Sequence, residues 1–282
     1  MVREGVYFLL TMGVGLKYEI LGSLRIGDGQ GTFATLTARK MEILLATLLI
    51  RAEEVVSIDQ LTTEIWGGNP PRRAGAALHV YVSQLRKFLK RPGRDDSPIV
   101  TRAPGYTFRL GQDELDLHEF QKLMSNGRSL ARAGNFEEAV VSLEDALALW
   151  RGPVLGELRD GPMINGFANW LGEIRLECVE LLVSSNLMLD RHEELIGWLY
   201  SLIAEHPLHE RFYQQLMLAL YRSGRRADAL KVYQTAREQL MAELGLEPCA
   251  PLRDLQRCIL AAADEEIEHH AANRGWRVPI RD

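Results

Sequence analysis

The segment AALHVYVSQLRKFLK, residues 76–90, carries side chains of the types and spacing that would bind a polyanion. A helical repeat of 100° per residue divides this segment and the residues just before it into two faces. The apolar face comprises Ala74, Leu78, Tyr81, Val82, Leu85, Phe88 and Leu89. The opposite face comprises Arg72, Ala76, His79, Val80, Ser83, Arg86, Lys87 and Lys90. This second face contains no carboxylate, whereas a solvated helix face usually mixes both signs of charge.

Positive charge is concentrated in the same part of the chain. The 282 residues have a formal net charge of −5, but residues 1–112 hold 15 Lys and Arg against 10 Asp and Glu. Residues 113–282 hold 18 against 28. Between residues 72 and 109, nine cations are opposed only by Asp95 and Asp96. Such a local excess attracts a polyanion, and duplex DNA is the commonest one.

Strands and two helices are predicted ahead of the two-faced segment. Residues 18–33 have the pattern of short strands joined by a glycine-rich hairpin turn. A phosphate-binding loop is the less favoured interpretation, because no helix with a Lys-Ser/Thr pair follows the glycines. Residues 38–51 and 57–66 have helical periodicity, and Ser57 is the expected N-cap of the second helix. A rigid loop then follows, formed by Gly67, Gly68, Asn69, Pro70 and Pro71.

A β-hairpin is predicted after the two-faced helix. The segment PIVTRAPGYTFRL, residues 98–110, contains two β-rich runs around an Ala-Pro-Gly turn. The order of strands, helix, helix, loop, helix and hairpin is that of an α+β winged helix-turn-helix. In this fold the second helix of the helix-turn-helix pair, here the two-faced helix, enters the major groove. We assign residues 16–112 to this DNA-binding domain and residues 1–15 to an N-terminal extension.

The rest of the chain is predicted to be all-α. Three turns between successive helical stretches look alike: GNFEEA at Gly134, DRHEEL at Asp190 and GRRADA at Gly224. The second and third are 34 residues apart, the period of tetratricopeptide helix pairs, and the insertion GPVLGELRDGP lengthens the first interval. We expect a tetratricopeptide-like helical repeat domain over residues 113–263, with a concave surface that binds protein, and a flexible tail over residues 264–282.

The sequence offers no signature of an enzyme, a cofactor site or a metal site. It contains no G-x-S-x-G motif, no paired catalytic carboxylates and no G-x-x-x-x-G-K-S/T. The histidines of HPLHE cannot share one helical turn because Pro207 separates them, and His269 and His270 lie in the expected tail.

The expected location is the cytoplasm. The sequence has no membrane span and no export signal, since the apolar residues 6–16 lack a basic start and a cleavage site. We interpret the three cysteines as reduced thiols. Whether translation starts at Met1 or Met12 stays open.

Several blocks of sequence resemble known regulators. LTARKMEILLATLL, VYVSQLRKFL and IVTRAPGYTF resemble the winged-helix output domain of OmpR/PhoB-type response regulators. Their combination with WGGNPPRRAGAALHVYVSQLR, ALALWRGPVL and GRRADALKVYQTAREQLMAELGLEP resembles the Streptomyces antibiotic regulatory protein family far more specifically. The similarity runs from about residue 16 to residue 260. Members of this family are pathway-specific transcriptional activators in which a bacterial transcriptional activator domain follows the winged helix.

The resemblance implies partners and site residues. Two protomers are expected to bind side by side, as a homodimer on direct repeats in double-stranded promoter DNA, and to recruit RNA polymerase holoenzyme. The polymerase-contacting loop would be Gly67, Gly68, Asn69, Pro70 and Pro71. Together, the resemblance and the helical faces give a DNA-binding set of Arg72, Arg73, Ala76, His79, Val80, Ser83, Arg86, Lys87, Lys90, Arg102 and Thr107. Within it, we expect Arg86 and Lys87 to contact phosphates and His79 and Val80 to contact bases.

The sequence departs from the most basic family members at two positions. Ala76 and Ser83 stand where arginines are often found. Because the sequence contains no receiver domain ahead of the winged helix, control by aspartate phosphorylation is not expected. We predict an activator of antibiotic or other secondary-metabolite biosynthesis that is a monomer or weak dimer without DNA. The alternatives are a protein-binding adaptor that does not bind DNA and a repressor that acts by promoter occlusion.

Overall fold

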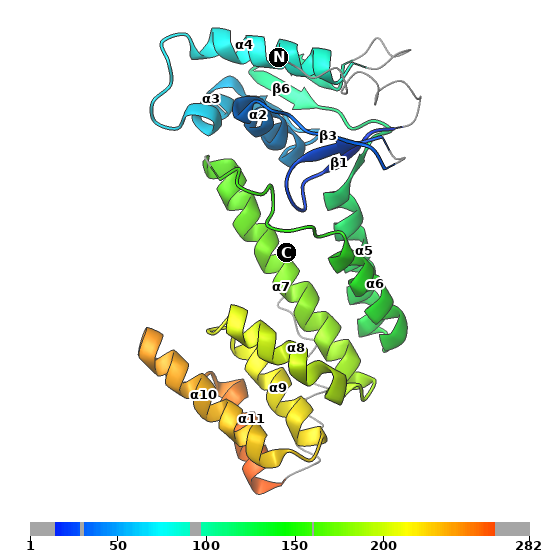
Figure 1. Ribbon diagram of the computed structural model, residues 1–282, viewed down its shortest axis with the longest axis vertical. Coiled ribbons are helices and arrows are strands. Elements are labelled where there is room, and N and C mark those ends of the chain that lie inside the picture. Colours follow the sequence, from blue (N-terminus) through cyan, green and yellow to red (C-terminus); the bar gives the residue numbers. More distant parts are fainter. Residues whose placement is uncertain (1–14, 29–30, 91–96, 160, 263–282) are drawn as a thin grey trace. The chain divides into compact units, whose positions relative to one another are not determined.

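The computed structural model describes residues 15–28, 31–90, 97–159 and 161–262 (Figure 1). Two compact units divide them: one gathers the described residues within Met1–Lys122 and Ala146–Arg175, and the other those within Leu123–Asp145 and Leu176–Asp282. The expected tail, with its two histidines, and all of the N-terminal extension except Gly15 lie outside the described residues. Within the described part, a winged helix precedes a helical domain, so the predicted fold class is confirmed.

A four-stranded sheet opens the first unit. Its strands are β1 (Lys17–Glu19), β2 (Arg25–Gly27), β3 (Phe33–Ala34) and β7 (Glu114–Leu115), in the order β3-β2-β1-β7. Strands β2 and β3 pair antiparallel, with Ile26 opposite Ala34, so they flank the predicted hairpin turn. Strand β7 pairs parallel with β1.

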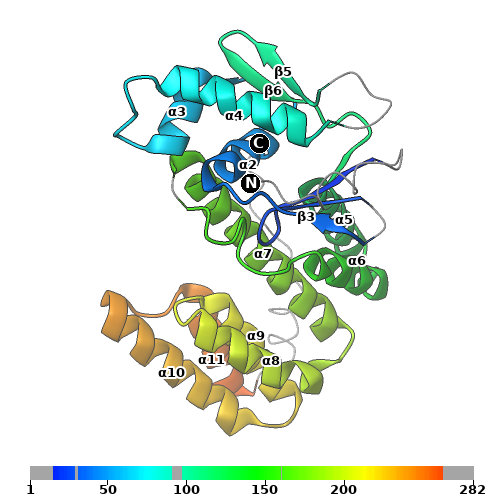
Figure 2. The same ribbon diagram turned by 45° about the horizontal axis from the view of Figure 1, so that its top comes forward.

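The helix-turn-helix and the wing follow the first three strands. The helices are α2 (Arg39–Ile50), α3 (Ile58–Trp66) and α4 (Ala74–Phe88). The second sheet contains β4 (Val56–Ser57), β6 (Gly105–Phe108) and β5 (Ile99–Arg102) in that order, all antiparallel. Figure 2 shows α4 running beside the β5–β6 hairpin. The helices share a core of fully buried leucines, including Leu44 and Leu48 of α2, Leu61 of α3 and Leu78 of α4.

The start of α3 follows the predicted capping. The Ser57 hydroxyl accepts a hydrogen bond from the Gln60 backbone N–H at 3.1 Å, and the Gln60 side chain accepts one from the Ser57 N–H at 3.0 Å. This reciprocal pair satisfies two backbone donors that a helix N-terminus otherwise leaves without partners. The cap therefore fixes where the helix-turn-helix begins.

Residues on the C-terminal side of residue 112 complete the first unit. The buried Asp116 carboxylate accepts hydrogen bonds from the backbone N–H groups of Ile20 and Leu21 at 2.9 and 3.0 Å. Burial raises the pKa of Asp116 to about 6, although these bonds and Arg151 act in the opposite direction. The compact unit therefore continues past the predicted domain boundary, because strand β1 and the turn after it need partners from further along the chain.

The insertion GPVLGELRDGP, together with Arg151 just before it, also contacts the start of the first unit. The backbone N–H groups of Arg151 and Leu155 donate to the carbonyl oxygens of Leu21 and Ile20, at 2.8 and 3.0 Å. The Arg39 guanidinium donates to the Glu157 carbonyl oxygen at 2.9 Å. The insertion therefore does more than lengthen a repeat interval, since it satisfies backbone groups of the β1–β2 turn.

A carboxylate from the helix-turn-helix caps a helix that begins a hundred residues later. Glu64 of α3 is 1% exposed, and its two carboxylate oxygens accept the backbone N–H groups of Met163 and Ile164, both at 2.8 Å. These N–H groups belong to the first turn of α7 (Pro162–Met188). A Cβ atom on Gly161 would clash with the carboxylate of Glu64, so any larger residue there would displace this cap. A buried anion at the positive end of a helix is favourable.

The second unit is built of helices. Besides parts of α7, it contains residues of α5 (Asp116–Arg132) and α6 (Phe136–Ala148), and then α8 (His192–Glu205), α9 (Glu210–Arg222), α10 (Arg226–Leu244) and α11 (Ala250–Ala261). Helix α9 packs against α8, α10 and α11 (Figure 1). Gln215 of α9 donates to the Glu180 carbonyl oxygen at 2.8 Å, which ties α9 to α7.

The three similar turns share one geometry. Gly134, Asp190 and Gly224 all have left-handed backbones, with φ of 82°, 57° and 71°. In each turn, the next N–H group donates to the carbonyl oxygen five residues earlier, which closes a helix C-terminus. These bonds are Asn135 to Leu130 at 3.0 Å, Arg191 to Asn186 at 3.1 Å and Arg225 to Leu220 at 2.8 Å. The repeat predicted from the sequence is therefore confirmed in the backbone.

We expect Glu64→Gln to loosen the start of α7. The amide keeps one acceptor oxygen, so one buried N–H group of Met163 or Ile164 loses its partner, at a cost of about 1–3 kcal/mol. Amide hydrogen exchange at these two residues should accelerate by about tenfold or more. The matched control is Glu54→Gln, because the Glu54 side chain is 64% exposed. Equal exchange rates in the two variants would contradict the capping role.

Candidate nucleic-acid interface

Packing of α4 fixes which of its faces meets solvent. Leu78, Val82, Leu85 and Leu89 are 1% exposed or less. The other side leaves exposed Ala76, His79, Val80, Ser83, Lys87 and Lys90. The two faces predicted from helical periodicity therefore correspond to the buried and the exposed sides of α4, except that Ala74, Tyr81, Phe88 and Arg86 are half-buried.

Helix α4 begins at Ala74, after the two arginines that precede it. Arg72 and Arg73 lie in a turn before Ala74, and both are exposed. No side chain caps the N-terminus of α4, and its first turn contains no acidic residue. The positive end of the helix dipole therefore adds to two arginine charges, which favours an anion at this end.

Most cations of the predicted interface are not compensated. Within the described ranges of the chain, no carboxylate forms an ion pair with Arg72, Arg73, Lys87, Lys90 or Arg102. By contrast, Lys231 and Arg225 of the helical unit both pair with Asp228. Cations that no described carboxylate pairs with raise the local positive potential, as binding of a polyanion requires.

Arg86 occupies a different position from the other cations. It is half-buried, its Nε donates to the Ile99 carbonyl oxygen at 3.0 Å, and one terminal nitrogen donates to Thr101 Oγ1 at 2.8 Å. Its guanidinium carbon also lies 5.8 Å from the centre of the Tyr106 ring. Two of its five N–H donors hold α4 against the β5–β6 hairpin, which leaves three for the predicted phosphate contact.

His79 is joined to the same hairpin. Its Nδ1 lies 2.6 Å from the Tyr106 hydroxyl oxygen, and the two rings meet edge to face. Tyr106 is 3% exposed, and burial raises the pKa of its hydroxyl while the Arg86 charge opposes this shift. The sequence reasoning did not include Tyr106. A tyrosine on the second strand of a predicted hairpin looks like a core residue, and its hydroxyl partner lies 27 positions away.

The wing presents Arg102 but not Thr107. Arg102 is exposed at the end of β5, next to the Ala103-Pro104 tip. Thr107 is 1% exposed because it lies on β6, the central strand between β4 and β5. The prediction that Thr107 reaches DNA is therefore wrong for this conformation.

The loop after α3 is held at its base and exposed at its tip. Trp66 stacks on Tyr81 with ring centroids 6.0 Å apart, and Lys40 Nζ lies 5.2 Å from the Trp66 ring. Gly67 ends the helix with a φ of 62°, a conformation that favours glycine. Gly68, Asn69, Pro70 and Pro71 are exposed. The predicted polymerase-contacting loop is thus exposed to solvent, and the contacts of Trp66 hold its base.

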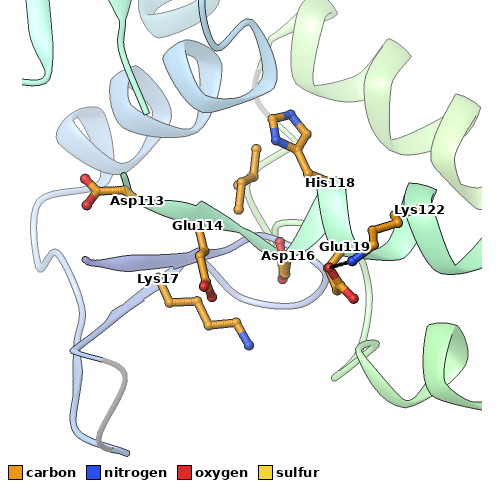
Figure 3. A pocket seen from close by; sticks show the side chains of 8 residues that line it. Lys17, Asp113, Glu114, Asp116, His118, Glu119 and Lys122 are labelled. Carbon is orange, nitrogen blue, oxygen red and sulfur yellow. Dashed lines mark ion pairs between the residues drawn. The ribbon is translucent and has the colours of Figure 1, made fainter. Parts of the chain in front are cut away.

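A cavity of about 460 Å³ lies elsewhere in the first unit, beside the paired strands β1 and β7 and the start of α5 (Figure 3). Lys17, Asp113, Glu114, Leu115, Asp116, His118, Glu119 and Lys122 line it. Lys122 pairs with Glu119 at 3.7 Å, and Asp113 and Asp116 accept backbone hydrogen bonds from the β1 region. Four of the polar groups that line this cavity therefore have partners within the fold.

The HPLHE histidines have protein partners of their own. His209 Nε2 lies 2.5 Å from Glu180 Oε1, and the His206 ring contacts Phe212. Among the described residues, no group of three His, Cys, Asp or Glu side chains is arranged to hold a metal ion. No helix in the described part of the chain is both long and apolar enough to cross a bilayer.

Comparison with known proteins matches both parts of the chain. Residues 31–108 match the family described as transcriptional regulatory protein, C terminal, and residues 115–260 match the bacterial transcriptional activator domain. Regulatory protein AfsR of Streptomyces coelicolor is 38% identical over 258 residues, which are 91% of this chain and 25% of AfsR. This chain therefore spans about a quarter of the length of AfsR.

Other relatives have lengths closer to that of this chain. Regulatory protein DnrI of Streptomyces peucetius is 33% identical over 88% of this chain and 93% of its own length. Transcriptional regulatory protein MoaR1 of Mycobacterium tuberculosis is 34% identical over 92% and 83%. The solved structure of Mycobacterium tuberculosis EmbR with a low affinity phosphopeptide aligns with a TM-score of 0.83 at 34% identity, covering 91% of this chain and 69% of that one. The chain therefore belongs to the Streptomyces antibiotic regulatory protein family of DNA-binding transcriptional activators.

Proposed function

We propose that this protein binds promoter DNA by inserting the exposed face of α4 into the major groove. The observation that carries the proposal is the uncompensated positive charge on a helix face that its own core leaves bare. Arg72, Arg73, Lys87 and Lys90 would contact phosphates, and Arg102 on the wing would reach the backbone or the minor groove. Ala76, His79, Val80 and Ser83 would meet base edges.

The family membership supports a specific arrangement on the promoter. Two protomers bind direct repeats whose centres lie about 10 to 10.5 bp apart, which places both on one side of the duplex. The protein is a monomer or a weak dimer without DNA. The exposed loop from Gly67 to Pro71 then contacts RNA polymerase and recruits it to a promoter for antibiotic or other secondary-metabolite biosynthesis.

Two alternatives predict different results. An adaptor that uses only its helical repeats would bind no duplex. A repressor that acts by occlusion would bind the promoter and reduce transcription in vitro. The genes beside its coding sequence offer the promoters to test, and neighbouring biosynthesis genes would identify the pathway.

Lys87→Ala should weaken binding to specific and random duplexes by similar factors. Removing one phosphate contact should reduce the slope of log K against log salt by about 0.9. Fluorescence anisotropy titrations at several salt concentrations measure both quantities. Lys231→Ala is the matched control, because it removes an exposed lysine that pairs with Asp228 in the helical unit. An unchanged slope in Lys87→Ala would exclude a phosphate contact there.

Replacing Asn69, Pro70 and Pro71 together by alanine should separate transcription from binding. These residues are exposed and lie outside α4, so affinity for the promoter should stay within about twofold of the wild type. Transcription in vitro with RNA polymerase holoenzyme should fall to the level seen without activator. Full activation by this variant would contradict the polymerase-contacting role of the loop.

A further inference from the structure

His79 is the residue of the exposed α4 face whose chemistry the structure defines most closely. Its Nδ1 is engaged by Tyr106 at 2.6 Å, and the residue is exposed to solvent. A neutral imidazole carries its hydrogen on either nitrogen, so Nε2 is a donor in one tautomer and an acceptor in the other. Which base edges His79 can pair with therefore depends on what Tyr106 does to Nδ1.

The surroundings of Tyr106 favour one direction of this hydrogen bond. The Tyr106 residue is 3% exposed, and a buried phenol usually finds an acceptor for its hydrogen. Arg86 approaches the same ring but has only donors. Within the described part of the chain, His79 Nδ1 is the group that lies within hydrogen-bonding distance of the hydroxyl. If the phenol donates to Nδ1, the ring hydrogen of a neutral imidazole lies on Nε2.

Arg86 holds the hairpin that carries Tyr106 against the helix that carries His79. Its bonds to Ile99 and Thr101 join α4 to β5, and Thr101 is paired with Tyr106 across the hairpin. The two hydrogen bonds of Arg86 therefore hold α4, which carries His79, beside the strand pair that carries Tyr106. Arg86 is a positioning residue in this arrangement.

We propose that Tyr106 makes His79 a hydrogen-bond donor that reads an acceptor on a base edge in the major groove. This inference rests on the proposed function, because it requires α4 to enter the groove. Guanine offers two adjacent acceptors there, N7 and O6, whereas cytosine offers a donor. Ala76 and Ser83, at three residues before and four after, are small and leave space beside the ring. His79 therefore favours a guanine over a cytosine at the position it faces.

The first measurement needs no DNA. Long-range nitrogen-proton NMR correlations of His79 in the full chain report which ring nitrogen carries the hydrogen. We expect the Nε2–H tautomer in the wild type and a mixture in Tyr106→Phe, which keeps the ring and removes only the hydroxyl. The Nδ1–H tautomer in the wild type would overturn the inference.

The second measurement is selection from a library of randomised duplexes. His79→Ala should lose about tenfold or more of the preference at one base position, while affinity for random DNA and its salt slope stay unchanged. Tyr106→Phe should lose a few-fold at the same position. Tyr213→Phe is the matched control, because it removes a buried tyrosine hydroxyl that donates to the Pro207 carbonyl oxygen in the helical unit. It should leave the preference intact.

The outcomes separate this inference from the proposed function. Equal loss on all sequences in His79→Ala would indicate a phosphate contact and overturn base reading. Loss of preference in His79→Ala with none in Tyr106→Phe would overturn the role of Tyr106. A wild-type protein that binds no duplex would overturn the proposed function itself, whichever tautomer the NMR experiment shows.

Discussion

The structure depends first on the burial of one side of α4. Leu78, Val82 and Leu85 recur at intervals of four and three residues and are at most 1% exposed. Their burial fixes the rotation of the helix about its axis, because turning it would expose several apolar side chains at about 25 cal/mol per Å². Packing of the apolar face against the core therefore leaves the opposite face of α4 exposed to solvent.

Contacts between distant segments support this helix. Arg86 and His79 join α4 to the wing, and Trp66 stacks on Tyr81 at the base of the loop. The turn after β1 is completed by Asp116, and Glu64 of α3 caps the first turn of α7. A buried carboxylate is costly unless it is hydrogen-bonded, and both of these groups accept backbone N–H bonds. Folding of the winged helix therefore depends on hydrogen bonds to the segments that follow it in the chain.

Local patterns in the sequence were enough to predict most of the elements. The period of α4, the capping box at Ser57 and the three left-handed turns each depend on residues within a few positions of one another. The exposed candidates Ala76, Val80, Ser83 and Lys87 followed from that period alone. The segment before α4 was less predictable, because arginines can continue a helix or precede it.

Contacts across long sequence separations could not be predicted in the same way. The resemblance to related winged helices gives Thr107 as a DNA contact, but alternation along a strand cannot reveal that β6 is the central strand, on which Thr107 is buried. The periodicity of α4 places Arg86 near the exposed face but cannot show that its guanidinium bonds to Ile99. Glu64 has the appearance of a surface residue on an amphipathic helix, and its partners lie a hundred residues away.

Binding by a variant with one carboxylate on the α4 face tests the central claim most directly. Val80 is 52% exposed in the middle of that face, and Val141, 58% exposed on α6, provides the matched control. Promoter affinity should fall by at least about tenfold in Val80→Glu, because a carboxylate would face the DNA polyanion, and should be unchanged in Val141→Glu. Wild-type affinity in Val80→Glu would contradict insertion of this face into DNA.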